Sequence, residues 1–109
     1  MNKYVAILSK KNRQLFSDGL LNKHVSYLKS LKRSGVLLLC GPFSDNDSAI
    51  QIIMSDSLKS AKETIQSDPF VSQGYYSELL VKELIEANSA NNWLVTDPQT
   101  EANRASSQV

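Results

Sequence analysis

The sequence is poor in the two residue types that most often build metal sites and covalent cross-links. Its 109 residues include one cysteine, Cys40, and one histidine, His24. One cysteine cannot form an intrachain disulfide, and no Cys/His zinc cluster can be assembled within one chain. Glycine-rich phosphate loops and the G-x-S-x-G, H-E-x-x-H and C-x-x-C motifs are also missing. We therefore expect chemistry without a metal or a cofactor, although carboxylate sites for hard cations stay open.

The sequence also lacks a long apolar run. The longest, Val36–Cys40, is stopped by Gly41 and Pro42 and falls far short of the roughly 20 residues that cross a bilayer. The first ten residues lack the apolar block and the small-residue cleavage site of a secretory signal peptide. We therefore expect no membrane partner and a cytoplasmic location.

An excess of one charge is missing as well, because the formal net charge is only +1. That balance gives no overall electrostatic footprint for nucleic acid, so we expect no nucleic-acid partner. The distribution is nevertheless uneven, since residues 1–33 hold eight Lys and Arg against Asp18 alone, a local charge of +7. Such a region can concentrate a small anionic ligand, but a solvated helix face or complementarity within the fold is the more frequent explanation.

What the sequence does contain is the composition of a soluble globular domain, with 41% hydrophobic and 21% charged residues. Apolar residues alternate where strands are expected and recur at helical spacing where helices are expected. Gly35 and Pro69 mark the ends of the two helices. The expected elements are strands at 3–9, 36–43, 49–54 and 75–84, and helices at 20–34 and from 58 to the turn at Asp68.

The order of these elements, βαββαβ, predicts an α+β fold in which two right-handed split βαβ units place both helices on one face of a four-stranded antiparallel sheet. The first strand is apolar in both phases, and the third carries Ile50 and Ile52 on one face and Ile53 on the other. Something must therefore cover the second face, and we predict a homodimer that forms through it. In the last strand, alternation places Tyr75 and Tyr76 on opposite faces.

The segment at 86–109 differs from the domain expected at 1–85. It is rich in Asn, Ser, Ala and Thr, contains Pro98, and has its one bulky apolar cluster at 93–95. On composition it is a mobile polar extension. Packing against the domain would hold it in place, and Trp93 is the expected anchor.

His24 and Asp68 are the expected catalytic residues. His24 shares a helical stripe with Leu21 and Leu28, so its imidazole faces inward and needs hydrogen-bond partners. Asp68 follows the second helix, where a carboxylate is unfavourable without a cation nearby. A hydrogen bond between the two would fix the imidazole tautomer and leave its other nitrogen free to exchange a proton with a substrate. The alternatives are a core histidine bonded to a backbone carbonyl and an aspartate that caps the D-P-F turn.

Two segments that pair proline with phenylalanine are expected to line a pocket beside these residues. Gly41, Pro42 and Phe43 end the second strand, and the D-P-F segment supplies Pro69 and Phe70. Rigid apolar walls around a polar centre are typical of small-molecule sites, so we assign these five residues to ligand binding. Core packing of the phenylalanines is the more frequent alternative.

Together these motifs resemble the YciI-like family. The resemblance rests on H-V-S-Y-L-K-S-L-K-R-S-G at 24–35, G-P-F at 41–43, Ala61 in the second helix and D-P-F-V-S-Q-G at 68–74, and it covers about residues 3–82. It implies a ferredoxin-like fold that dimerises through its sheets, as in the dimeric α+β barrels. It also implies a cleft whose catalytic pair is His24 and Asp68. The related activities process lactones or chloroaromatic compounds without a cofactor.

These expectations lead to a cofactor-free enzyme of the isomerase, lyase or hydrolase type that acts on a small organic molecule, with an anionic one favoured by the N-terminal charge. His24 would serve as general base or acid, and Asp68 would orient it. Two other functions stay open. The same cleft could bind a ligand without turnover, or the chain could be a dimeric accessory domain whose partner binds the extension after Glu86.

Overall fold

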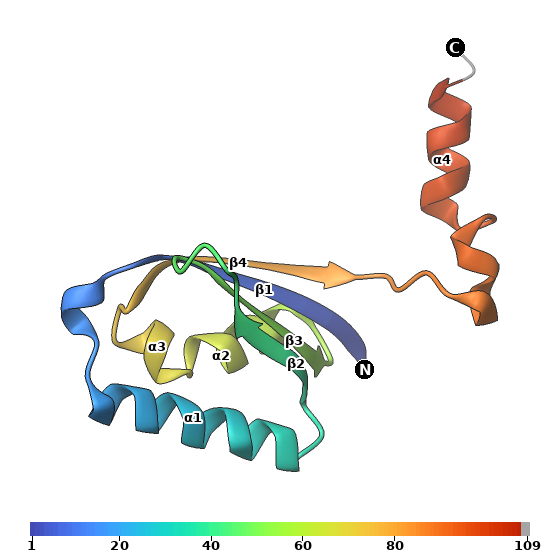
Figure 1. Cartoon of the computed structure of the whole chain (residues 1–109). Coiled ribbons are helices and arrows are strands. Elements are labelled where there is room, and N and C mark those ends of the chain that lie inside the picture. The colour runs from blue at the N-terminus through green and yellow to red at the C-terminus, as the bar shows by residue number, and fades with distance from the viewer. Residues whose placement is uncertain (108–109) are drawn as a thin grey trace.

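A computed structural model of the chain describes residues 1–107. The strands of this part of the chain are β1 (Asn2–Lys11), β2 (Leu37–Pro42), β3 (Ala49–Ser55) and β4 (Tyr76–Leu84). They form one sheet in the order β2-β3-β1-β4, and all neighbouring strands are antiparallel. The helices α1 (Asp18–Arg33), α2 (Leu58–Gln66) and α3 (Pro69–Ser72) lie on one face of the sheet (Figure 1). The expected α+β fold of the ferredoxin-like type is confirmed.

Local signals in the sequence set the ends of the two long helices. The hydroxyl of Ser17 accepts a hydrogen bond from the backbone N–H of Leu20 at 3.0 Å and caps α1. Ser57 caps α2 in the same way. After α1, Gly35 adopts a φ of +78°, a left-handed conformation that favours glycine and turns the chain toward β2. These caps fix where α1 begins, and therefore which of its side chains face the sheet.

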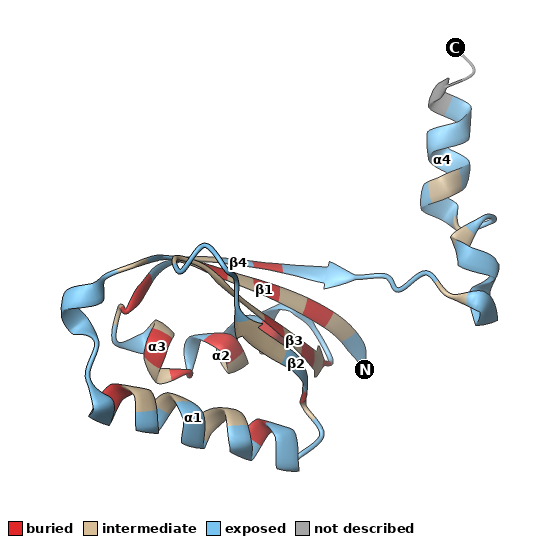
Figure 2. Ribbon diagram, viewed as in Figure 1, coloured by how far each residue is buried: buried red, intermediate tan, exposed pale blue. Residues whose placement is uncertain are grey.

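The hydrophobic core lies between the sheet and the helices. Tyr4, Ala6 and Leu8 of β1 alternate toward the helices and are buried, and they pack in one cluster with Ile53 of β3 and Ile65 of α2. Buried residues in Figure 2 accordingly fall on the helices and on alternate positions of the strands. This packing holds α1 and the segment after α2 against the same face of the sheet, which is where the candidate site forms.

The opposite face of the sheet is apolar at its centre, and no helix within residues 1–107 lies over it (Figure 1). Ile7 lies on this face at the centre of β1, with Ile50 opposite it on β3 and Leu80 opposite it on β4. Leu80 is 52% exposed, and Leu39 of β2 is exposed as well. Both alternating sets of side chains on β1 therefore contribute apolar residues, one set to each face of the sheet. The homodimer expected to cover the second face stays a prediction.

Two local features differ from the sequence-based expectation. The turn expected after α2 contains the short helix α3, because Asp68 caps its first turn and Pro69 supplies a preset φ at its first position. Tyr75 and Tyr76 do not separate onto opposite faces, since both rings are buried and both contact the ring of Phe70. The strand β4 begins only at Tyr76, so strict alternation does not yet apply to Tyr75.

The C-terminal extension is helical where the structure describes it. It contains the 3-10 segment η2 (Ser89–Leu94) and the helix α4 (Pro98–Ser107), which project away from the sheet (Figure 1). Trp93 is 64% exposed, so the expectation that it anchors the extension to the domain is wrong. Local signals outweigh the polar composition here, because Asp97 accepts a hydrogen bond from Gln99 N–H just before the proline that begins α4. No helix among residues 1–107 is long and apolar enough to span a membrane.

Candidate functional site

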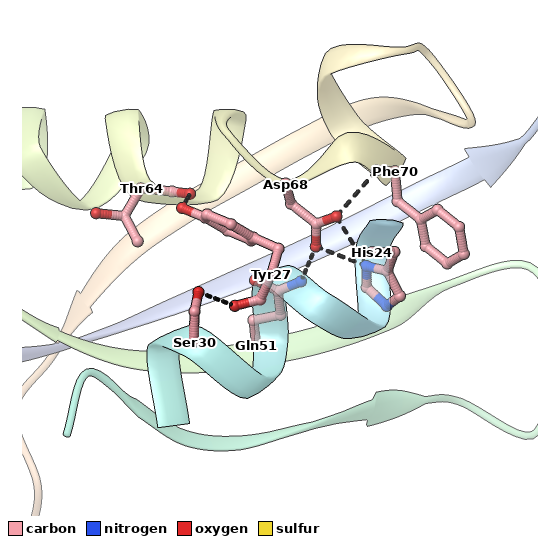
Figure 3. Close-up of polar contacts among 7 residues, drawn as sticks. All are labelled: His24, Tyr27, Ser30, Gln51, Thr64, Asp68 and Phe70. Atoms are coloured by element: carbon pink, nitrogen blue, oxygen red, sulfur yellow. Dashed lines mark hydrogen bonds and ion pairs between the residues drawn. The ribbon is translucent and has the colours of Figure 1, made fainter. Parts of the chain in front are cut away.

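His24 and Asp68 come together from two different elements. His24 lies on α1, and Asp68 lies in the link between α2 and α3. The imidazole Nδ1 is 2.7 Å from Oδ1 of Asp68 and 2.9 Å from Oδ2 (Figure 3). The partner of this histidine is thus a carboxylate, and the alternative of a histidine bonded to a backbone carbonyl does not describe the contact.

The Asp68 carboxylate is fully buried and surrounded by N–H donors. Its Oδ1 accepts a hydrogen bond from the backbone N–H of Phe70 at 2.9 Å, and its Oδ2 accepts one from Nε2 of Gln51 at 2.8 Å. The side chain therefore caps α3 and contacts His24 at once, so the two interpretations left open by the sequence hold together. A buried carboxylate needs several hydrogen-bond donors to offset its loss of hydration, and His24, Phe70 and Gln51 provide them.

These contacts fix which imidazole nitrogen faces the carboxylate and which is left free. Both oxygens of Asp68 already accept N–H donors, so Nδ1 of His24 takes the role of the protonated nitrogen. The second nitrogen, Nε2, points away from the carboxylate in Figure 3. The ring is also held from one side, because it stacks on Phe70 with 3.7 Å between ring centroids and 7° between ring planes. The His24 side chain keeps 15% of its surface exposed.

A cavity of about 350 Å³ opens beside this pair. Its polar lining comes from His24, Gln51 and Lys11. Much of the remaining lining is aromatic or aliphatic, and the aromatic members are Phe16, Phe70, Tyr75 and Tyr76. A mostly apolar wall with a few convergent polar groups is the usual form of a small-molecule site.

Three of the five residues assigned to ligand binding line this cavity, and two do not. Gly41, Pro42 and Phe70 are part of the wall. Phe43 lies beyond the end of β2 and is exposed. Pro69 begins α3, and neither it nor Phe43 lines the cavity. In each proline and phenylalanine pair, one member lines the cavity and the other does not.

Sequence reasoning missed Gln51, Tyr75 and Tyr76. Gln51 is 3% exposed and lies on the same face of β3 as the core residue Ile53. A polar residue in the phase of a core strand was the available signal. The tyrosines pack around Phe70, with centroid distances of 4.6 Å for Tyr75 and 5.9 Å for Tyr76. Strand alternation placed these two tyrosines on opposite faces of the sheet, because the sequence does not show that β4 begins only at Tyr76.

The pKa values of two side chains that line the cavity, Tyr76 and Cys40, are raised. Burial, with the neighbouring Tyr75 and the charge of Asp68, raises the pKa of Tyr76 to about 12. Burial also raises the pKa of the Cys40 thiol, and the charge of Asp68 adds to that shift. Both groups are therefore neutral near pH 7. A neutral thiol is a poor nucleophile.

The concentration of positive charge in residues 1–33 is partly balanced within the fold. Lys3 forms an ion pair with Glu86 at 2.6 Å, and Lys10 forms one with Glu78 at 2.7 Å. Lys11 is the basic residue of this region that lines the cavity. Among residues 1–107, no group of three or more His, Cys, Asp or Glu side chains is arranged to hold a metal ion.

Comparison with known structures finds matches that cover most of the chain at low sequence identity. A 5-chloro-2-hydroxyhydroquinone dehydrochlorinase from Burkholderia phenoliruptrix, solved with 2,5-dihydroxybenzoquinone, is 19% identical; the alignment covers 82% of this chain and 99% of that one, with a TM-score of 0.54. A protein of Arabidopsis thaliana is 13% identical over 81% of this chain and 97% of its own, with a TM-score of 0.50. A dimeric ferredoxin-like protein of unknown function from Thermobifida fusca is 10% identical over 79% of this chain and 92% of its own, with a TM-score of 0.45.

Sequence comparison places the chain more narrowly than these structures do. A search of the curated proteins finds no match. The family model described as the YCII-related domain, however, matches residues 3–85, which include α1, the D-P-F segment and all the strands described above. The match agrees with the motifs at 24–35 and 68–74, and it extends over more than half of the chain. The chain therefore belongs to the YCII-related domain family.

Proposed function

We propose that this chain is a cofactor-independent enzyme that acts on a small organic molecule in the cavity beside His24. The observation that carries the proposal is the 2.7 Å contact between Nδ1 of His24 and the buried Asp68 carboxylate, with His24 in the wall of the cavity. In this arrangement Nε2 is the general base or acid, and Asp68 is the group that orients the ring. A positioned base of this kind contributes about 10² to 10⁴ in rate.

The reaction class that suits this pair is proton transfer. Nε2 accepts a proton from the bound substrate, and the electron pair left behind either expels a leaving group or rearranges before a proton is returned. Elimination follows in the first case and isomerisation in the second. The neighbouring structure of a dehydrochlorinase supports the first, because its name describes loss of hydrogen chloride from a hydroxylated chloroaromatic compound. Lys11 at the cavity wall favours a substrate with negative charge.

We further propose that the active form is a homodimer. Two copies that pack by their open sheet faces would bury Leu39, Leu80 and the apolar residues around Ile7. The closed two-fold arrangement suits a surface that is apolar across its centre. The cavity lies on the other side of the sheet, between the sheet and α1, so each copy keeps its own site.

The test is a turnover assay with a panel of hydroxylated chloroaromatic compounds and lactones, including 5-chloro-2-hydroxyhydroquinone. Chloride release and exchange of carbon-bound hydrogen with solvent deuterium are followed by NMR. We expect His24→Asn to lower the rate by about 10² to 10⁴, because the Asn amide can still donate to Asp68 but has no Nε2. The matched control, Lys23→Gln, changes an exposed residue one position earlier on α1 and should keep the rate.

Two results would contradict the proposal. Equal rates in His24→Asn and wild type would remove the imidazole from the chemistry. Saturable binding of panel compounds at His24 without turnover of any of them would assign the cavity to a ligand-binding module, which is the other function that the sequence left open.

A further inference from the structure

The side chain of Gln51 has a hydrogen-bond acceptor that the protein does not satisfy. Gln51 is 3% exposed and lines the cavity. Its Oε1 is buried and has no hydrogen-bond partner among the described residues 1–107. Leaving such an acceptor without a donor is unfavourable, and native proteins keep few of them. This unsatisfied acceptor belongs to a residue in the wall of the cavity where a ligand is proposed to bind.

The contact with Asp68 fixes which end of the Gln51 amide is the nitrogen and which is the oxygen. Nε2 of Gln51 donates to Oδ2 of Asp68 at 2.8 Å. A rotation that exchanged the two ends of the amide would bring Oε1 against the carboxylate oxygen, and neither of those atoms can donate. Oε1 therefore stays an acceptor. Asp68 also holds Nδ1 of His24, so the imidazole turns its other nitrogen, Nε2, away from the carboxylate.

The cavity wall thus contains Gln51 and His24, both held by one buried carboxylate. One candidate donor within the sheet is Cys40, which is paired with Gln51 in the strand register. No hydrogen bond joins its thiol to Oε1, even though Oε1 is otherwise unpartnered. The walls beside these residues are aromatic, with Phe70 stacked on His24 and Tyr75 against Phe70.

We propose that Gln51 determines which ligands the cavity accepts. It selects a small aromatic or other apolar molecule that carries an O–H or N–H donor, and it rejects a molecule of the same shape that offers only an acceptor or no polar group there. This inference rests on the proposed function only in that the cavity holds a small molecule, and it does not require turnover. Gln51 is a specificity-determining residue, and the ligand donor is what completes its hydrogen bonds.

The experiment compares phenol with anisole, which differ in whether the oxygen carries a hydrogen. Both are titrated into the full-length protein with the Gln side chains labelled with ¹³C and ¹⁵N. We expect phenol to bind about tenfold more tightly than anisole, since a hydrogen bond to a buried acceptor is exchanged for an unsatisfied one. The carbonyl carbon of Gln51 should shift with phenol and not with anisole, while its N–H₂ resonances stay in place.

Two variants locate the preference. In Gln51→Met, which is similar in length and has no acceptor of comparable strength, the phenol preference should disappear. In His24→Asn it should persist. If the preference persists in Gln51→Met and disappears in His24→Asn, the donor goes to the imidazole and the inference is wrong. Should Gln51→Met fail to fold, the affinity ratio and the Gln51 carbon shift in the wild type decide the question alone.

The remaining outcomes also discriminate. Equal affinities for phenol and anisole refute the role of Gln51 and leave the proposed enzyme untouched. A water molecule that donates a hydrogen bond to Oε1 would produce this result. Binding of neither probe at millimolar concentration refutes the cavity as a small-molecule site, and both the inference and the proposed function then fail. A phenol preference without turnover of any panel compound supports the inference and removes the enzymatic proposal.

Discussion

Replacing Asp68 by alanine should be one of the most destabilising substitutions available in this fold. The carboxylate is fully buried and serves three donors, His24 Nδ1, Gln51 Nε2 and Phe70 N–H. In Asp68→Ala the imidazole can move its proton to the other nitrogen, but the amide and backbone donors have no such option. Two buried donors without partners cost about 1–3 kcal/mol each, so we expect a loss of about 4 kcal/mol. A domain of this size has a stability of about 5–15 kcal/mol.

Asp68→Asn should cost much less, because one orientation of the new amide satisfies every neighbour. The backbone N–H of Phe70 cannot turn, so the Asn carbonyl must occupy the Oδ1 position, where it also accepts from His24. The Asn NH₂ then faces Gln51, whose amide can rotate to accept from it. All three contacts survive as neutral hydrogen bonds, and we expect a loss of about 1–2 kcal/mol. The rotation of Gln51 should also abolish the preference for phenol over anisole.

The assay is urea unfolding at pH 7, followed by intrinsic fluorescence, with the free energy of unfolding extrapolated to water. Asp56→Ala is the matched control, because Asp56 is exposed just before the cap of α2 and its loss should stay within about 0.5 kcal/mol. The reasoning is refuted if Asp68→Ala and Asp68→Asn cost the same, or if Asp68→Ala costs less than about 1 kcal/mol. Either result would mean that the donors around this carboxylate are satisfied by something else.

Three further predictions follow from other parts of the fold. The pKa of Tyr76 is raised from 10.0 to about 12 in the folded protein, so the unfolded chain loses this proton at a lower pH. The free energy of unfolding should therefore fall by about 1–2 kcal/mol as the pH rises through that interval. Urea unfolding of Tyr76→Phe should show a smaller fall. A chain that ends at Asn88 should unfold at the same urea concentration as the full chain, since the extension projects away from the sheet. The variant Leu80→Lys should sediment as a folded monomer, because it places a charge on the exposed sheet face. The wild type and the control Glu63→Lys, on the exposed surface of α2, should sediment as dimers. A monomeric wild type would refute the dimer.

The fold was predictable because its signals are local and repeat along the chain. The doubly apolar first strand, the helical stripe through His24 and Leu28, and the glycine at 35 each match what the structure shows for β1 and α1. The extension was not predictable in the same way. Its average composition is polar, whereas the helix α4 depends on one aspartate and proline pair at its start and on alanine, glutamate and arginine within it.

The site was predictable in part. An inward-facing histidine and an unfavourably placed aspartate suggested each other, and their side chains are in contact. Gln51 was missed because no short motif surrounds it and its importance lies in contacts between β3 and the segment before α3. Both members of each proline and phenylalanine pair were assigned to the cavity wall, and one of each, Pro42 and Phe70, lines it, since sequence order cannot tell which of two adjacent side chains turns toward a cavity.

The geometry of the site is determined by the same contacts that build the local fold. Phe70 binds Asp68 through its backbone N–H and stacks its ring on His24, so one residue holds both members of the pair. Pro69 restricts the backbone between them, and the cap of α3 fixes where the carboxylate points. The imidazole therefore needs no ligand to reach its orientation, and binding energy does not have to be used to align it. Under the proposed function, this preorganisation is what would let a weakly bound small molecule, recognised through one donor, serve as a substrate.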